Sequence, residues 1–226
     1  QASLKKANLI NLSETEVPVN MGESTPVAGK YAEMALSYAC NDLKNKTIDA
    51  IVTAPINKNN IQSEQFHFPG HTEYLASAFG AENPLMMMIS PAVKLGFVTN
   101  HVAIENVAKN ISKELIIKKL QVLNQSLVKD FGCTNPKIAV LSLNPHAGDK
   151  GLIGKEEENF IIPAIREAFD QKIYAFGPYP ADGLFGSGNY SKFDAVLAMY
   201  HDQGMIPFKI LADREGVNYT AGLPIV

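Results

Sequence analysis

Short β-rich runs alternate with longer helical periods along almost the entire chain, and this alternation restricts the possible folds more than any other feature of the sequence. Runs typical of strands cover residues 48–53, 84–89, 94–99, 137–143, 172–176 and 194–199, with a last short run near 208–211. Helical periods cover residues 27–44, 72–79, 112–131 and 155–170. Strands that alternate with helices favour an α/β fold with a largely parallel central sheet.

Residues at the ends of these segments support the assignment. Pro26 suits the first turn of the first helix. A Ser90-Pro91 turn joins the second and third strands, which predicts an antiparallel pair. Three acidic residues at 156–158 suit the positive end of the dipole of the helix that they begin. The Gly-, Ser- and Asn-rich residues 183–191 are predicted to form an exposed loop, and no boundary between domains is visible in the composition.

Composition excludes several classes of function. The chain has 226 residues, of which 46% are hydrophobic and 19% are charged, enough apolar material for one large domain or two smaller ones. The net charge is −3 and the basic residues are scattered, so no surface for nucleic acid is indicated. The longest apolar runs are shorter than a membrane span and are interrupted by polar residues or proline, so no membrane insertion is expected.

The cysteines and the first residue bear on the cellular location. Cys40 and Cys133 lie far apart and neither stands in a metal-binding spacing. Buried free thiols are the simplest interpretation, and they suit a reducing cytoplasm. The chain begins with Gln1 and shows no signal-peptide pattern, so we expect a processed chain or a piece of a longer one.

Three of the five histidines follow the carboxyl ends of predicted strands, namely His101 in VTNH, His146 in LNPH and His201 in MYH. Ligands of open α/β sheets bind in the crevice beyond those strand ends. One histidine there is explained by a structural hydrogen bond, but three at equivalent ends favour side chains that converge. Converging imidazoles form a divalent metal site with positions left open for a substrate. Three nitrogen ligands favour zinc, cobalt, nickel or manganese over an all-oxygen magnesium site, although the spacing matches no local zinc motif.

A second candidate site lies in the stretch FHFPGHTEY. Here His71 and Thr72 open a predicted helix, where free backbone N–H groups, a hydroxyl and an imidazole can hold an anion. The alternative is that Thr72 only caps the helix, and the sequence does not decide between the two. His67 is interpreted as an ordinary loop residue.

Six motifs appear in order and carry a family resemblance. They are TAPINK (53–58), FPGHTEYLA (68–76), LNPHAGDKGLIGKEE (143–157), GPYPADGLF (177–185), DAVLAMYHDQGMIPFK (194–209) and GVNYTAGLP (216–224). Together they closely resemble the 4-hydroxythreonine-4-phosphate dehydrogenase family of vitamin B6 biosynthesis, over most of the chain. The resemblance implies a fold like that of isocitrate and isopropylmalate dehydrogenases, with two α/β domains flanking a cleft. Residues 1–226 would then form most of one such two-domain unit.

The resemblance also implies a set of site residues. The family holds a divalent metal, expected to be zinc, cobalt, manganese or magnesium, with histidines that match His101, His146 and His201 here. The family works as a homodimer whose metal site is shared between subunits, so one of the three histidines would come from the partner. Its substrate contacts match four residues in this chain, namely His71, Thr72, Lys209 and Asn218. Lys209 and the His71–Thr72 pair would hold a phosphate at some distance from the metal.

The family reaction oxidises the C3 hydroxyl of 4-phosphooxy-L-threonine with NAD and releases CO2, which gives 3-amino-2-oxopropyl phosphate for pyridoxal 5'-phosphate biosynthesis. Asp202 and Asp182 are carboxylates near the site in sequence, and either could orient a ligand or move a proton. A supporting contact to a histidine is the preferred role for Asp202. Lys58 is a third candidate, for proton transfer or substrate contact.

Some features depart from the family pattern or leave alternatives open. A family arginine is expected directly after Val226, and a glycine-rich segment is expected before the first residue, so the chain resembles a fragment lacking both ends. Ala54 and residues 213–215 are minor departures. The motifs also fit a dehydrogenase for erythronate or threonate 4-phosphate. A phosphotransacetylase-like acyltransferase, a metal-bound hydrolase and a non-catalytic binding module are further alternatives, and the acyltransferase needs no histidine triad.

Overall fold

The computed structural model describes residues 6–225, and the chain divides into two compact units. Of the described residues, the first unit comprises 6–80 with 224–225, and the second comprises 81–223. None of the helices in the described part combines the length and the apolar character needed to cross a membrane.

The first unit contains helices α1 (Pro26–Lys44) and α2 (His71–Phe79), both of which the sequence predicted. Pro26 is the first residue of α1, and the Thr25 hydroxyl accepts the Ala28 N–H at 3.2 Å as the cap. Gly29 lets a turn lie directly on this helix, because a Cβ there would sit 1.8 Å from the Asn60 carbonyl oxygen.

The strand predicted at residues 48–53 is wrong. No strand in the described chain pairs with residues 48–53, and Val52 is 98% exposed. The β-branched side chains of this run therefore have no sheet to pack on. Both cysteines are free. The expectation of a buried thiol is confirmed for Cys40, where burial raises the pKa, and only in part for Cys133.

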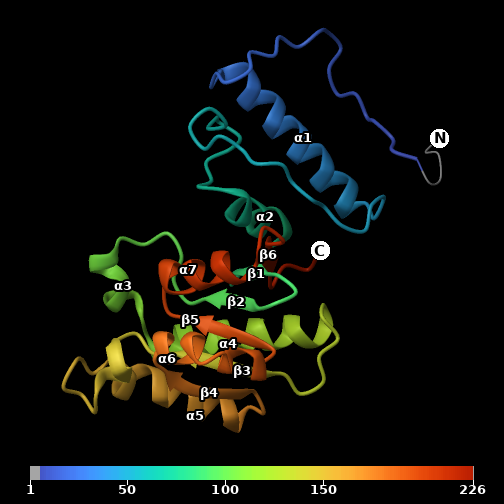
Figure 1. The fold of residues 1–226 in the computed structure, drawn as a ribbon. Coiled ribbons are helices and arrows are strands. Elements are labelled where there is room, and N and C mark those ends of the chain that lie inside the picture. The colour runs from blue at the N-terminus through green and yellow to red at the C-terminus, as the bar shows by residue number, and fades with distance from the viewer. Residues whose placement is uncertain (1–5, 226) are drawn as a thin grey trace. The chain divides into compact units, whose positions relative to one another are not determined.

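The second unit is built on a six-stranded sheet of order β4-β3-β5-β2-β1-β6 (Figure 1). The strands are β1 (Leu85–Ile89), β2 (Lys94–Phe97), β3 (Lys137–Leu141), β4 (Tyr174–Tyr179), β5 (Ala195–Ala198) and β6 (Val217–Ala221). β4, β3, β5 and β2 run parallel, which confirms the predicted largely parallel sheet. β1 pairs antiparallel with β2, as predicted, and also with β6.

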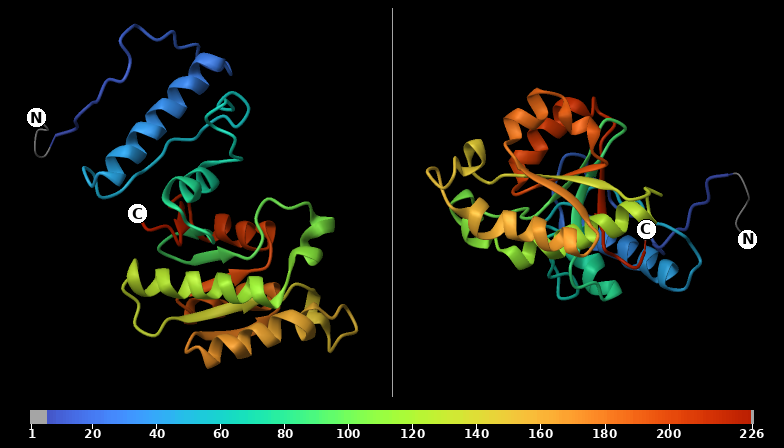
Figure 2. Two further views of the ribbon diagram at one scale, coloured as in Figure 1. Left: turned by 180° about the vertical axis from the view of Figure 1, so that it is seen from behind. Right: turned by 90° about the horizontal axis from the view of Figure 1, so that it is seen from below.

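Helices cover both faces of this sheet (Figure 2). Alternate residues of β3 point to opposite faces, so Ile138 packs with α4 (Lys113–Lys129) and α5 (Ile162–Asp170). Ala139 packs on the other face with α6 (Ala181–Gly186) and α7 (His201–Leu211). Helix α3 (Ile104–Asn110) follows β2. Short 3-10 helices cover Pro145–Gly148 and Asn189–Lys192, and a π-helical turn at Glu157–Ile161 leads into α5.

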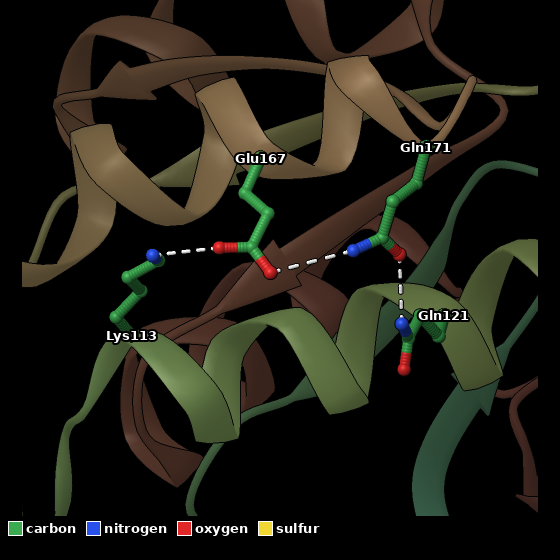
Figure 3. A network of polar contacts seen from close by, with 4 residues as sticks. All are labelled: Lys113, Gln121, Glu167 and Gln171. Carbon is green, nitrogen blue, oxygen red and sulfur yellow. Dashed lines mark hydrogen bonds and ion pairs between the residues drawn. The ribbon is translucent and has the colours of Figure 1, made fainter.

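A chain of polar contacts ties α4 to α5 on the surface (Figure 3). Lys113 pairs with Glu167 at 2.6 Å, and the Gln171 amide links Glu167 to Gln121 on α4. Both members of the ion pair are more than a third exposed, so it adds little to stability, and apolar burial between the helices carries the packing.

Two predictions near the carboxyl terminus are wrong. The run near 208–211, predicted as a strand, belongs to α7, in which Gly204 and Phe208 are four residues apart and buried on one face. The predicted loop at 183–191 is largely helical, because Leu184 anchors α6 in the core. Helix α3 and strand β6 were not indicated by the sequence patterns.

Candidate functional site

The structure brings His101 and His201 together at the carboxyl edge of the sheet, with ring centroids 5.5 Å apart and planes tilted by 39°. His101 follows β2 and His201 is the first residue of α7, which follows β5. β2 and β5 are parallel neighbours whose pairing continues beyond the strands, since the Thr99 N–H and hydroxyl both donate to the Met199 carbonyl. Residues that leave neighbouring strands at the same edge are thereby held side by side.

Two contacts orient His201. Its Nδ1 lies 2.7 Å from Oδ1 of Asp202, and its ring stacks on Phe97 with centroids 6.1 Å apart. A carboxylate on Nδ1 favours the tautomer with the proton on that nitrogen, which leaves the Nε2 lone pair available to a cation. Phe97 is fully buried in β2, so it provides a fixed surface for the ring.

Gln203 ties together two strand ends at this edge. Its Oε1 accepts the Met199 N–H at 2.7 Å after β5, and its Nε2 donates to the Ser142 carbonyl at 2.6 Å after β3. The side chain therefore couples the segment that leads to His201 with the segment that leads to His146. No role for Gln203 was predicted from the sequence, although an amide directly after a buried strand is a signal for such a contact.

His146 does not join the other two histidines. It lies in the short helix after β3 with φ of 52°, in the left-handed region, and no group of three metal-ligating side chains forms among residues 6–225. The described chain therefore gathers two of the three predicted metal ligands. The Glu157 carboxylate, predicted only to favour the helix dipole, accepts the backbone N–H groups of Leu143 and Asn144, just before His146.

A pocket of about 520 Å³ opens at the carboxyl ends of β3, β4 and β5. Asp182 in the first turn of α6 and Asp202 in the first turn of α7 both line it. Its walls are largely apolar and include Phe185, Ile206 and Ile210. Two candidate catalytic carboxylates thus share one cavity, and Asp182 has no hydrogen-bond partner among the described residues.

Lys209 and Asn218 lie outside this pocket. Lys209 is exposed in the last turn of α7, eight residues after His201, which corresponds to about 12 Å along the helix axis. Asn218 is exposed on the edge strand β6, where it is paired with Met88 of β1.

The remaining predicted site residues belong to the first unit. Gly70 is the N-cap of α2 and His71 its first residue, so Thr72 lies inside the first turn and the alternative that it is the cap residue is wrong. Burial lowers the pKa of His71, which favours its neutral form. Tyr74 of α2 stacks on Phe66, which precedes the helix, with ring centroids 5.1 Å apart. Lys58 is exposed in a turn.

The chain is similar to known proteins over its whole length. The family model described as "Pyridoxal phosphate biosynthetic protein PdxA" matches residues 1–226. A 4-hydroxythreonine-4-phosphate dehydrogenase from Bacteroides thetaiotaomicron is 50% identical over the whole chain, which spans 62% of that relative. A protein from Oceanobacillus iheyensis named as a D-threonate 4-phosphate dehydrogenase is 42% identical over 98% of this chain, which spans 67% of it.

A solved structure shows the same fold. The crystal structure of a 4-hydroxythreonine-4-phosphate dehydrogenase from Klebsiella pneumoniae superposes with a TM-score of 0.83 at 33% identity. The match covers 92% of this chain and 62% of that one. The predicted fold class is confirmed, and the chain spans less than two thirds of the length of several relatives that it matches.

Proposed function

Because the chain belongs to the family of the pyridoxal phosphate biosynthetic protein PdxA, we propose that it acts as a metal- and NAD-dependent 4-hydroxythreonine-4-phosphate dehydrogenase. The reaction would oxidise the C3 hydroxyl of 4-phosphooxy-L-threonine and release CO2 to give 3-amino-2-oxopropyl phosphate. The observation that carries the proposal is the His101–His201 pair, 5.5 Å between ring centroids, with Asp202 on Nδ1 of His201. A cytoplasmic location is part of the proposal.

The donor set fits a divalent cation of the zinc, cobalt or manganese type better than magnesium. Two adjacent imidazoles supply nitrogen ligands, and the Asp202 contact holds one of them in the tautomer that can bind. When bound, such a cation lowers the pKa of a coordinated hydroxyl and polarises a carbonyl. The sequence holds no G-x-G-x-x-G turn, so no residue of this chain is assigned to NAD binding.

The two pocket carboxylates take different roles in the proposal. Oδ1 of Asp202 is engaged with His201, so Asp202 positions the imidazole. Asp182 lines the same pocket without a partner among the described residues, and it is the carboxylate available to accept the hydroxyl proton. Lys58, in the first unit, remains a further proposal for proton transfer or substrate contact.

Four residues are proposed to bind substrate. A lysine contact to a phosphate is worth about 1.5–3 kcal/mol. Lys209→Met is therefore expected to raise KM for the phosphorylated substrate about 10- to 150-fold with little change in kcat. Lys137→Met, at the amino end of β3, is the matched control and should leave KM unchanged.

The other proposed contacts are Asn218 on β6 and, as anion-binding residues of the first unit, His71 and Thr72.

We further propose that the protein is a homodimer in which His146 of one copy completes the metal site formed by His101 and His201 of the other. The absence of a three-residue site among residues 6–225, together with the 5.5 Å pair, supports this arrangement. In a closed two-fold dimer, the His146 loop of each copy would reach the His101–His201 pair of the other copy, which would complete two equivalent sites.

Mixing variants tests the shared site. In a dimer of one His146→Ala chain and one His201→Ala chain, one site would retain all three histidines. Random reassociation makes half the dimers mixed, so about a quarter of the original activity should return. A mixture of His101→Ala and His201→Ala chains is the matched control, since no combination restores a complete site. Equal recovery in both mixtures, or none in either, would contradict the crossing of His146.

The relative named for D-threonate 4-phosphate favours a second candidate function, oxidation of a phosphorylated hydroxy acid that carries a hydroxyl instead of an amino group at C2. NADH production by the full-length protein with 4-phosphooxy-L-threonine, D-threonate 4-phosphate and erythronate 4-phosphate discriminates the two. We expect the highest kcat/KM with 4-phosphooxy-L-threonine and loss of activity with chelator. NADH production that is indifferent to chelator would contradict the metal assignment. No NADH production with any of the three substrates would favour the metal-bound hydrolase or the non-catalytic binding module.

A further inference from the structure

Glu157 is a buried carboxylate that the proposed reaction does not use. It is 2% exposed and is the first residue of the π-helical turn that leads into α5. A carboxylate in the interior persists only when hydrogen-bond donors replace the water that it loses. π-Helical turns are rare and often mark functional positions. The donors that surround Glu157 therefore indicate its role.

Among the described residues, the three donors to Glu157 come from Leu143 and Asn144, which lie just before the loop that contains His146. Oε1 accepts the N–H of Leu143 at 2.8 Å and the N–H of Asn144 at 2.7 Å. Oε2 accepts the side-chain amide of Asn144 at 2.9 Å. The same amide donates to Glu156 at 2.7 Å, which lowers the pKa of Glu156. Two consecutive carboxylates thus hold Asn144 from one side.

The surrounding loop closes tightly on this contact, and two glycines make it possible. A Cβ at Gly148 would lie 2.6 Å from Oε2 of Glu157. A Cβ at Gly154 would lie 2.5 Å from the side-chain nitrogen of Asn144. Any larger residue at these positions would displace the carboxylate or the amide. The loop is consequently shaped around the Glu157–Asn144 contact.

The loop itself has an unfavourable backbone. Every residue from 146 to 151 has φ between 43° and 86°, and four of them, His146, Ala147, Asp149 and Lys150, are not glycine. L-residues avoid this region, so such a run persists only when neighbouring structure holds it in place. The hydrogen bonds of Glu157 hold Leu143 and Asn144, just before the run, and its carboxylate lies close to Gly148 within the run.

From these contacts we propose that Glu157 is a positioning residue that fixes the direction in which the loop presents His146. This inference rests on the proposed function, in which His146 is a metal ligand. Glu157 would act through His146 and not as a metal ligand itself. It holds the backbone of Leu143 and Asn144 so that the imidazole two residues later is aimed before a cation binds.

Cobalt binding and amide exchange test the proposal in the full-length protein. Glu157→Gln keeps the size of the side chain but replaces one acceptor oxygen with an NH2 group, which cannot accept a hydrogen bond from Leu143 or Asn144. We expect the Kd for Co²⁺ alone, followed by its visible absorption, to rise about 10- to 100-fold, with kcat recovering at saturating cobalt. In metal-free protein, hydrogen exchange of residues 143–154 should become faster. Glu158→Gln is the matched control, because Glu158 is the exposed neighbour, and it should change neither value.

Asn144→Ala provides a second variant if Glu157→Gln folds poorly. It removes one donor and keeps both backbone contacts, so the Kd for Co²⁺ should rise in the same direction by a smaller factor. His146→Ala separates the two proposals. If it binds cobalt as the unaltered chain does, the proposed function fails. If His146→Ala loses cobalt binding while Glu157→Gln and Asn144→Ala keep normal cobalt affinity and slow exchange, only the positioning role of Glu157 is overturned. A lower Tm of Glu157→Gln or Asn144→Ala would not change that conclusion.

Discussion

The Nδ1 atom of His201 lies 2.7 Å from Oδ1 of Asp202, the residue that follows it in the chain. The two side chains start the helix that leaves β5, so the contact forms at the point where the sheet ends. The carboxylate of Asp202 is 74% exposed and the imidazole is 33% exposed. The pair therefore lies at the surface of the edge, where a ligand can reach the free nitrogen of His201.

Removal of this carboxylate should weaken metal binding without abolishing it. Asp202→Ala leaves the His201 ring in place on Phe97 but no longer selects its tautomer, so the Kd for Co²⁺ should rise about 10- to 100-fold. His201→Ala should abolish metal binding and turnover with little loss of folding. Titration of both variants with Co²⁺, followed by visible absorption, checks that His201→Ala weakens cobalt binding more than Asp202→Ala does. Equal Kd values for Asp202→Ala and the unaltered protein would remove Asp202 from the site.

Gln203 should contribute to stability as well as to site geometry. Gln203→Leu leaves the Met199 N–H and the Ser142 carbonyl without their partner, at a cost of about 1–3 kcal/mol for each buried group. The free energy of unfolding, measured with urea, should fall accordingly. Gln171→Leu is the matched control, because this glutamine belongs to the exposed network between α4 and α5 (Figure 3) and should change stability by at most about 0.5 kcal/mol. A similar loss of unfolding free energy in both variants would mean that the Gln203 hydrogen bonds add no more stability than those of the exposed Gln171.

The strands that sequence patterns identified most reliably are those buried on both faces. β3 and β5 each pair with two neighbours and read as continuous apolar runs, because helices cover the sheet on either side. Residues 48–53 have a similar composition without a partner strand in the described chain. A β-rich run does not reveal whether a partner exists, since the partner comes from a distant part of the sequence.

The same limit applies to the site. The strand-end rule predicted that His101 and His201 would lie close together, and β2 and β5 are indeed neighbours. His146 follows β3, the other neighbour of β5, yet it does not join them. Its place depends on a left-handed loop held by Glu157, eleven residues later. Local periodicity does not report such a contact, because only the folded loop brings the two residues together.

Gly204 should be intolerant of any side chain. A Cβ at this position would lie 2.6 Å from the buried ring of Phe97 and 3.1 Å from Ala198, so α7 would have to move away from the sheet. Gly204→Ala should lower the free energy of unfolding by about 1–3 kcal/mol and weaken cobalt binding, since His201 stacks on the same ring. At Gly183 of α6 nothing lies within 4 Å, so Gly183→Ala should be neutral or stabilising by up to about 1 kcal/mol. Destabilisation by both changes would point to helix geometry as the cause and not to the Phe97 contact.

His71 should make the stability of the protein depend on pH. Burial lowers its pKa below the usual value, because the charged imidazolium loses solvation at the start of α2. Above the unfolded pKa of about 6.5 both states are neutral and His71 contributes no dependence. As pH falls through that value the unfolded chain takes up the proton first, so stability decreases until the lowered folded pKa is reached. His71→Gln should therefore flatten the unfolding free energy measured by urea between about pH 7 and pH 5. An unchanged slope in His71→Gln would contradict the assignment.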